Sequence, residues 1–243
     1  MSQTAARTLD LLELIAGSSR PLKLMELAGA TGIDKSTTAR LLGFLEERTL
    51  IQRQPATKGY GVGPGLLSLS AAAMRTSDLP SLAGPHLQSL RDETGETASL
   101  HLRVGRRRVC VAGAESRHEL CRVLSLGESL PLCVGPSGKV MLAFLPDSEI
   151  RPLITPAAGR NRDALLRELE SIRARGAMAV IGDRTPGVGA LSVPLFRAGT
   201  PVASISVAGP ADRWDLDAMG RAEPRVRAVA ERLSAALGSG LAG

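Results

Sequence analysis

The most informative stretch of this 243-residue chain is TGIDKSTTARLL, which runs from Thr31 to Leu42. Gly32 supplies the backbone freedom that a tight turn needs, and Asp34 or Ser36 can cap a helix that begins directly after it. A short helix with apolar residues on one face precedes the turn. This layout is typical of a helix-turn-helix, whose second helix lies in the major groove of DNA. The same residues also fit a capped surface helix.

The sequence around this stretch completes a small domain. An apolar-periodic helix lies ahead of it and ends at Gly17. Downstream, residues 50–53 and 60–62 are strand candidates on either side of a polar turn, which predicts a β-hairpin wing. We therefore expect a winged helix-turn-helix over residues 1–63. The residues of its third helix that are expected to face the other two are Ala39, Leu42 and Leu45.

The rest of the chain predicts a linker and a second domain. Small and apolar residues over 64–78 predict a linker helix that also pairs with a second chain. From residue 79 to 243, helices and strand-like runs follow one another as in an α+β sensor domain. Helices are expected over 82–94, 137–145, 163–175 and 226–237. Strands are expected over 97–104, 108–112, 120–126, 178–181, 190–196 and 202–208.

Composition narrows the class of protein. A net charge of +6 suits a polyanionic partner without proving one. Three widely spaced cysteines argue against a disulfide scaffold, offer no C-x-x-C metal site and fit a reducing cytoplasm. The N-terminus lacks the apolar core of a secretory signal, and the longest uncharged stretch, 59–74, is too short to span a bilayer. We expect a cytoplasmic protein that binds no membrane, metal or cofactor.

Several short motifs stand in a fixed order along the chain. They are GIDKSTTARLL at 32–42, YGVGPGL at 60–66, TGET at 94–97, LPL at 130–132, SGKVMLA at 137–143, RG at 175–176, PGV at 186–188 and SISVAGP at 204–210. Together they resemble the IclR family of bacterial transcriptional regulators over nearly the whole chain. The resemblance implies a winged helix-turn-helix, a dimerising linker helix and a GAF-like α/β effector-binding domain with a largely antiparallel sheet. It also implies a non-enzymatic regulator, often a repressor, acting as a homodimer or dimer of dimers on double-stranded operator DNA.

The DNA-contacting side chains are expected at the start of the third helix and on the wing. Cationic groups there can neutralise phosphate or reach guanine, and hydroxyl groups can bond phosphates or base edges. The helix candidates are Lys35, Ser36, Thr37, Thr38 and Arg40. The wing candidates are Arg53, Lys58 and Tyr60, for which a plain solvated hairpin is the alternative.

The resemblance also implies an effector pocket built from residues 132–137, 180–190 and 204–208. Members that bind glyoxylate or pyruvate use four polar side chains there, and the matching positions here are Val180, Ala190, Ser206 and Ala208. With one polar group left, a small anion lacks hydrogen-bond partners. We therefore expect an effector less polar or larger than glyoxylate, such as an aromatic acid or an amino-acid-like metabolite. The candidate pocket residues are Arg122, Cys133, Ser137, Asp183, Ala190 and Ser206; for Arg122 and Cys133, ordinary packing is an equal alternative.

Other functions fit the sequence less well. An enzyme would need Cys133 beside His101 or His118, and nothing in the sequence brings them together. The GPSGK at 135–139 falls short of a phosphate-binding loop. The arginine run at 105–108 fits either a second nucleic-acid patch or, better, a solvated hairpin turn. A protein-binding adaptor that uses its winged helix as an interaction surface stays open until DNA binding is measured.

Overall fold

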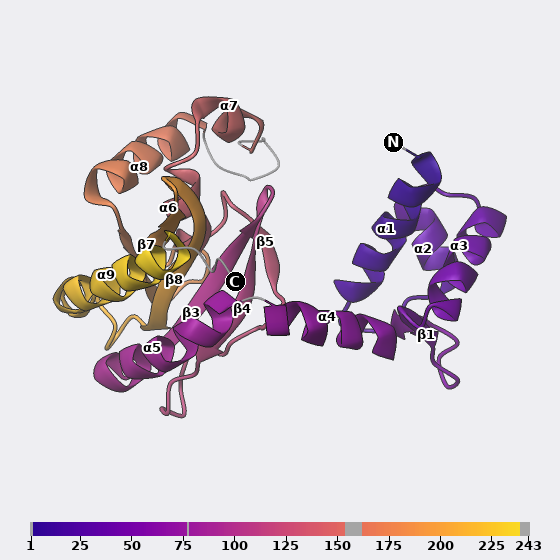
Figure 1. The fold of residues 1–243 in the computed structure, drawn as a ribbon, viewed down its shortest axis with the longest axis horizontal. Coiled ribbons are helices and arrows are strands. Elements are labelled where there is room, and N and C mark those ends of the chain that lie inside the picture. Colours follow the sequence, from indigo (N-terminus) through magenta and orange to yellow (C-terminus); the bar gives the residue numbers. More distant parts are fainter. Residues whose placement is uncertain (1, 77, 154–161, 239–243) are drawn as a thin grey trace. The chain divides into compact units, whose positions relative to one another are not determined.

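The structure is a computed structural model that describes residues 2–76, 78–153 and 162–238 (Figure 1). The chain divides into two compact units, residues 1–77 and 78–243, so the expected linker helix belongs to the first unit. Among the described residues, no helix is both long and apolar enough to cross a membrane.

The first unit is a three-helix winged helix-turn-helix followed by one further helix. Its elements are α1 (Gln3–Ala16), α2 (Leu24–Thr31), α3 (Lys35–Glu47), β1 (Ile51–Arg53), β2 (Tyr60–Val62) and α4 (Pro64–Thr76). Gly32 ends α2 at a φ of +65°, a left-handed conformation that favours glycine. Asp34 then caps α3 by accepting a hydrogen bond from the backbone N–H of Thr37 at 2.9 Å. The turn therefore follows directly from the residues that predicted it.

The inner face of α3 differs from the prediction by one residue. Leu42 and Leu45 are buried as expected, but Ala39 is exposed and Thr38 takes the inner position. Thr38 fits there because its hydroxyl donates to the backbone oxygen of Asp34 at 2.9 Å, which satisfies its polar atom inside the core.

The second unit is built on one sheet of six strands in the order β5-β4-β3-β8-β7-β6. All of its strand pairs are antiparallel, as the resemblance implied. The strands are β3 (Thr97–Val104), β4 (Arg107–Ala114), β5 (Ser129–Pro131), β6 (Met178–Ile181), β7 (Val188–Arg197) and β8 (Thr200–Pro210). The helices are α5 (Asp78–Thr94), α6 (Pro136–Leu142), α7 (Asp147–Ile150), α8 (Arg162–Arg175) and α9 (Leu216–Gly238), with a short 3-10 turn, η1, at Arg151–Leu153.

The two faces of this sheet have different chemistry. One face is apolar, with Leu100, Leu191 and Ile205 in a core shared with α5 and α9 (Figure 1). The opposite face carries buried polar side chains, which are Ser99, His101, Arg108, Ser192, Ser204 and Ser206. Successive residues of a strand point to opposite faces, so the same strands build both surfaces. The candidate site of this unit lies on the polar face.

The strand predicted over 120–126 is wrong, because that segment is irregular. Its backbone makes individual hydrogen bonds to side chains instead of pairing with a neighbouring strand. The oxygen of Arg122 accepts from the Thr97 hydroxyl at 2.6 Å, and the N–H of Leu124 donates to Glu115 at 2.8 Å. These bonds to side chains replace strand pairing, and the chain passes over the polar face before it enters β5.

Candidate functional site

The exposed face of α3 carries the first candidate surface. Lys35, Ser36 and Arg40 are exposed there, together with Ala39 and Gly43 one turn apart. Two small residues on this face leave room for a close approach to another surface. The helix start is capped: the Asp34 carboxylate accepts from the Ser36 hydroxyl at 2.7 Å and from the Thr37 N–H. These hydrogen bonds hold the pKa of the Asp34 carboxyl well below its usual range.

Two of the predicted contact residues on α3 have structural roles. Thr38 is fully buried, so the prediction that it contacts DNA is wrong. Thr37 is half-buried, and its backbone N–H is bound by the Asp34 cap. Lys35, Ser36 and Arg40 therefore remain the exposed candidates of this helix.

The three candidates on the wing differ in their exposure. Arg53 and Lys58 are exposed, whereas Tyr60 is half-buried and packs against the core of the first unit. Tyr60 also exchanges two backbone hydrogen bonds with Leu22, at 2.8 and 3.0 Å, which tie the wing to the start of α2. The Arg53 guanidinium lies 5.9 Å from the centre of the Tyr60 ring. Tyr60 thus supports the wing, and the two cations are its accessible groups.

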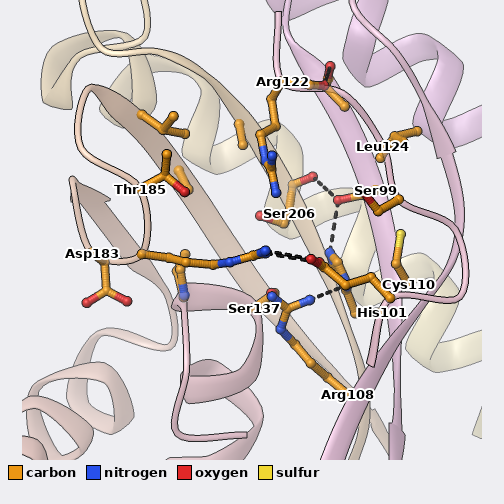
Figure 2. A pocket seen from close by; sticks show the side chains of 18 of the residues that line it. Ser99, His101, Arg108, Cys110, Arg122, Leu124, Ser137, Asp183, Thr185 and Ser206 are labelled. Atoms are coloured by element: carbon orange, nitrogen blue, oxygen red, sulfur yellow. Dashed lines mark hydrogen bonds and ion pairs between the residues drawn. The ribbon is translucent and has the colours of Figure 1, made fainter. Parts of the chain in front are cut away.

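The second candidate site is a cavity of about 80 Å³ on the polar face of the sheet (Figure 2). Strands β3, β4, β7 and β8 form its floor, and the start of α6, the 182–187 turn and the irregular 122–128 segment surround it. The predicted residues that line it are Arg122, Ser137, Asp183, Ala190 and Ser206. Cys133 does not line it and is buried in the core shared by α6 and α8, so its prediction as a pocket residue is wrong.

All four positions matched to the family's polar side chains lie on the wall of this cavity. Val180, Ala190 and Ala208 present apolar groups, and Ser206 is the polar one. The Ser206 hydroxyl oxygen accepts from Ser192 at 2.9 Å across the β7–β8 pair. This side of the cavity is therefore mainly apolar.

A chain of hydrogen bonds crosses the floor of the cavity (Figure 2). Arg108 Nη1 lies 2.9 Å from His101 Nδ1, and His101 Nε2 lies 3.0 Å from the Ser99 hydroxyl oxygen. Ser99 in turn donates to the backbone oxygen of Ser206 at 3.3 Å. Because an arginine only donates, His101 accepts at Nδ1 and carries its proton on Nε2. Burial, reinforced by the charge of Arg108, lowers the pKa of His101 to about 3, so the imidazole is neutral.

Charged side chains cluster in the same cavity. Arg184 is paired with Glu128 at 2.5 Å, and Asp183 is paired with the fully buried Lys139 at 2.6 Å. Figure 2 shows the Asp183 carboxylate turned away from Ser206 and Ser99. Arg108 is only 3% exposed, and burial together with the charge of Arg184 lowers its pKa to about 10, so it stays charged near neutral pH. The cavity wall is therefore rich in cations.

The sequence did not predict Arg108, His101 and Ser99 as residues that line this cavity. The run at 105–108 was interpreted as a solvated turn, which is wrong for Arg108 although Arg107 beside it is exposed and bonds Ser129. The alternation of β4 puts Arg108 on the same face as Cys110, which pairs with His101. That two-residue period was visible in the sequence, but the strand pairing that brings Arg108 to His101 and Ser99 was not.

The structure does not bring together the cysteine and the histidine that the enzyme interpretation needs. His101 is bound to Arg108 and Ser99, while Cys133 lies in a separate core. The thiol that does line the cavity is Cys110, and burial raises its pKa, which favours the less reactive protonated form.

Comparison with known proteins gives one consistent result. Residues 4–55 match the IclR helix-turn-helix domain, and residues 71–235 match the domain described as bacterial transcriptional regulator IclR C-terminal. The chain is 26% identical to the HTH-type transcriptional repressor AllR of Salmonella paratyphi A, over 98% of this chain and 90% of that protein. It is 33% identical to the HTH-type transcriptional regulator BhcR of Paracoccus denitrificans, over 84% and 76% respectively.

Solved structures agree with the sequence matches. The structure of an IclR transcriptional regulator from Alicyclobacillus acidocaldarius is similar at a TM-score of 0.83 and 25% identity. The similarity covers 98% of this chain and all of that one (100%).

Proposed function

The chain belongs to the IclR family of bacterial transcriptional regulators, and from that membership we propose that a metabolite in the cavity of the second unit controls binding to operator DNA. Its relatives are named transcriptional regulators and repressors, not enzymes. A regulator of chromosomal DNA works in the cytoplasm, where we place this protein.

We propose α3 as the recognition helix. The observation that carries this proposal is the exposure of Lys35, Ser36 and Arg40 on one face of a helix whose start Asp34 caps. The cations suit phosphates or guanine, and the serine suits phosphates or base edges. Arg53 and Lys58 on the wing suit contacts to the DNA backbone.

We propose an effector that is less polar or larger than glyoxylate, such as an aromatic acid or an amino-acid-like metabolite. The support is the apolar wall made by Val180, Ala190 and Ala208, at positions where small-acid binders of the family carry polar groups. A single recognition helix reads few base pairs, so we also propose a homodimer or a dimer of dimers.

Fluorescence anisotropy with DNA from upstream of the protein's own gene tests the DNA proposal. The triple variant Lys35→Ala, Ser36→Ala, Arg40→Ala should lose about 100-fold or more in specific affinity, since base contacts contribute about 1–3 kcal/mol each. Thr38→Val is the matched control on the same helix. It should retain specific binding, because the side chain is buried.

Retained specific binding by the triple variant would contradict the assignment of α3. Weak, salt-sensitive binding of the native protein to any DNA would instead favour the adaptor. Adding aromatic acids, amino acids and glyoxylate to the same assay tests effector control. Tight binding of glyoxylate would contradict the proposed effector class.

A further inference from the structure

One cation of the cavity is buried without its full set of hydrogen bonds. Arg108 uses Nη1 on His101, but its Nε–H has no hydrogen-bond partner within the part of the chain that the structure describes. Leaving a buried donor of a charged group unsatisfied costs free energy. A ligand with an oxygen acceptor in the cavity would satisfy this donor.

The acidic groups of the cavity are engaged with other cations. Glu128 pairs with Arg184 through both of its oxygens, at 2.5 and 3.0 Å. Asp183 pairs with Lys139, which also contacts Glu168 at 2.9 Å. His101, which does contact Arg108, is neutral and so leaves the arginine's charge in place.

We propose that Arg108 is the anion receptor of the pocket and binds the carboxylate of a compact organic acid. This inference rests on the proposed effector control and names the group that recognises the effector. The guanidinium offers a planar fork that suits a carboxylate. Figure 2 shows Arg122 entering the site from the side opposite Arg108, with Ser206 and Ser99 between them.

The remaining walls define the rest of the ligand. Val180, Val188 and Ala190 form an apolar side that suits a small hydrocarbon group. The cavity of about 80 Å³ is small beside the roughly 300–1,000 Å³ of sites for drug-sized ligands. The ligand is therefore an acid with a short apolar body. His101 is a positioning residue, because it holds the guanidinium and makes no ionic pair with it.

Isothermal titration calorimetry with matched acids and amides tests this inference. The probes are benzoate, phenylacetate and isovalerate, each compared with its primary amide on the native full-length protein. At least one acid should bind, and its amide, which lacks the charge, should bind about 10- to 100-fold more weakly.

Variants of β4 locate the contact. Arg108→Met should weaken binding of that acid about 10- to 100-fold, because it removes the charged donors. Arg107→Met is the matched control on the neighbouring, outward-facing residue and should bind like the native protein. Arg108→Lys keeps the charge but loses the fork, and should bind with intermediate affinity. It also serves as the second variant if Arg108→Met does not fold.

Three results would overturn the inference: equal binding of acid and amide, native affinity in Arg108→Met, or no binding of any acid at up to about 10 mM. None of them decides effector control itself. A neutral metabolite that releases operator DNA would keep the proposed function while this inference failed. If no compound changes DNA affinity, the proposed function fails even where an acid binds at Arg108.

Discussion

His101 shows how one neighbour sets the tautomer of a buried imidazole. Arg108 can only donate, so the imidazole nitrogen that faces it must accept. The other nitrogen then donates to Ser99, which passes a hydrogen bond to the backbone of β8. Burial disfavours the imidazolium, and its pKa falls to about 3. The residue thus orients Arg108 without adding charge to the cavity.

This arrangement predicts a pH-dependent loss of stability. The unfolded chain protonates His101 below about pH 6.5, whereas the folded protein does so only near its pKa of about 3. The contribution of His101 is therefore complete above about pH 6.5 and is lost progressively as the pH falls toward 3. Gln at this position can accept from Arg108 and donate to Ser99 without titrating, so His101→Gln should flatten the dependence.

Urea unfolding at about pH 7.5 and about pH 5.5 measures this difference. The native protein should lose up to about 1.4 kcal/mol per pH unit more than His101→Gln in this range. Carboxylates such as Glu128, whose pKa is lowered by Arg184, also reduce stability as the pH falls. They do so equally in the native protein and in His101→Gln, so the comparison cancels them. If the free energy of unfolding changes equally with pH in both proteins, the assignment of a neutral His101 would be contradicted.

At the scale of elements, a buried ion pair fixes the turn beside the cavity. Lys139 on α6 is fully buried and contacts Asp183 in the β6–β7 turn and Glu168 on α8. One side chain therefore joins three segments that are distant in sequence. The turn that it holds also carries Arg184, which reaches across to Glu128.

Removing this cation should destabilise the second unit. Lys139→Met leaves the buried Asp183 without its lysine, and loss of one partner of a buried pair costs about 3–5 kcal/mol. Arg225→Met is the control, because it breaks an exposed pair with Glu93 that is worth about 1 kcal/mol or less. Urea unfolding at neutral pH compares them. Equal destabilisation by the two substitutions would show that Lys139 has no special role.

At the scale of the whole molecule, the two units have separate cores. The core of the first unit contains Leu11, Leu27 and Leu42, and the sheet core of the second contains Leu100 and Ile205. Helix α4, at the end of the first unit, exposes Leu67 and Leu69, at 67% and 60% of their surface. Apolar residues exposed on a linker helix fit the proposed pairing with a second chain.

Light scattering after gel filtration tests this pairing. The native protein should have the mass of a dimer or a larger assembly, and Leu67→Asp with Leu69→Asp should shift it toward the monomer. The double variant should also bind operator DNA more weakly, because two recognition helices must act together. Met25→Ser removes a comparably exposed apolar residue, 63% exposed on α2, and should keep the native mass. An unchanged mass in the double variant would place the interface elsewhere.

The residues themselves determined the helix-turn-helix and the positions of most strands, whereas the antiparallel sheet was implied by the family resemblance. Gly32 and Asp34 act on neighbours one to three residues away, so their turn and cap can be predicted without the rest of the fold. Strands such as Thr97–Val104 and Met178–Ile181 also lie where their own patterns place them. Even so, local periodicity misplaced the inner face of α3 by one residue, because Thr38 satisfies its hydroxyl within the helix.

Only the tertiary structure decided which charged groups share the cavity. Arg108, His101 and Ser99 come together because β3 pairs with β4 and β8 while the 122–128 segment passes over them. Cys133 lies only three residues before the cavity-lining Pro136, yet its side chain is buried in the other core. Burial and hydrogen bonding of a charge depend on contacts between distant segments. For this reason the helix that we propose to face DNA could be located from the sequence, whereas the arginine that we assign to the effector could not be identified before the strands were paired.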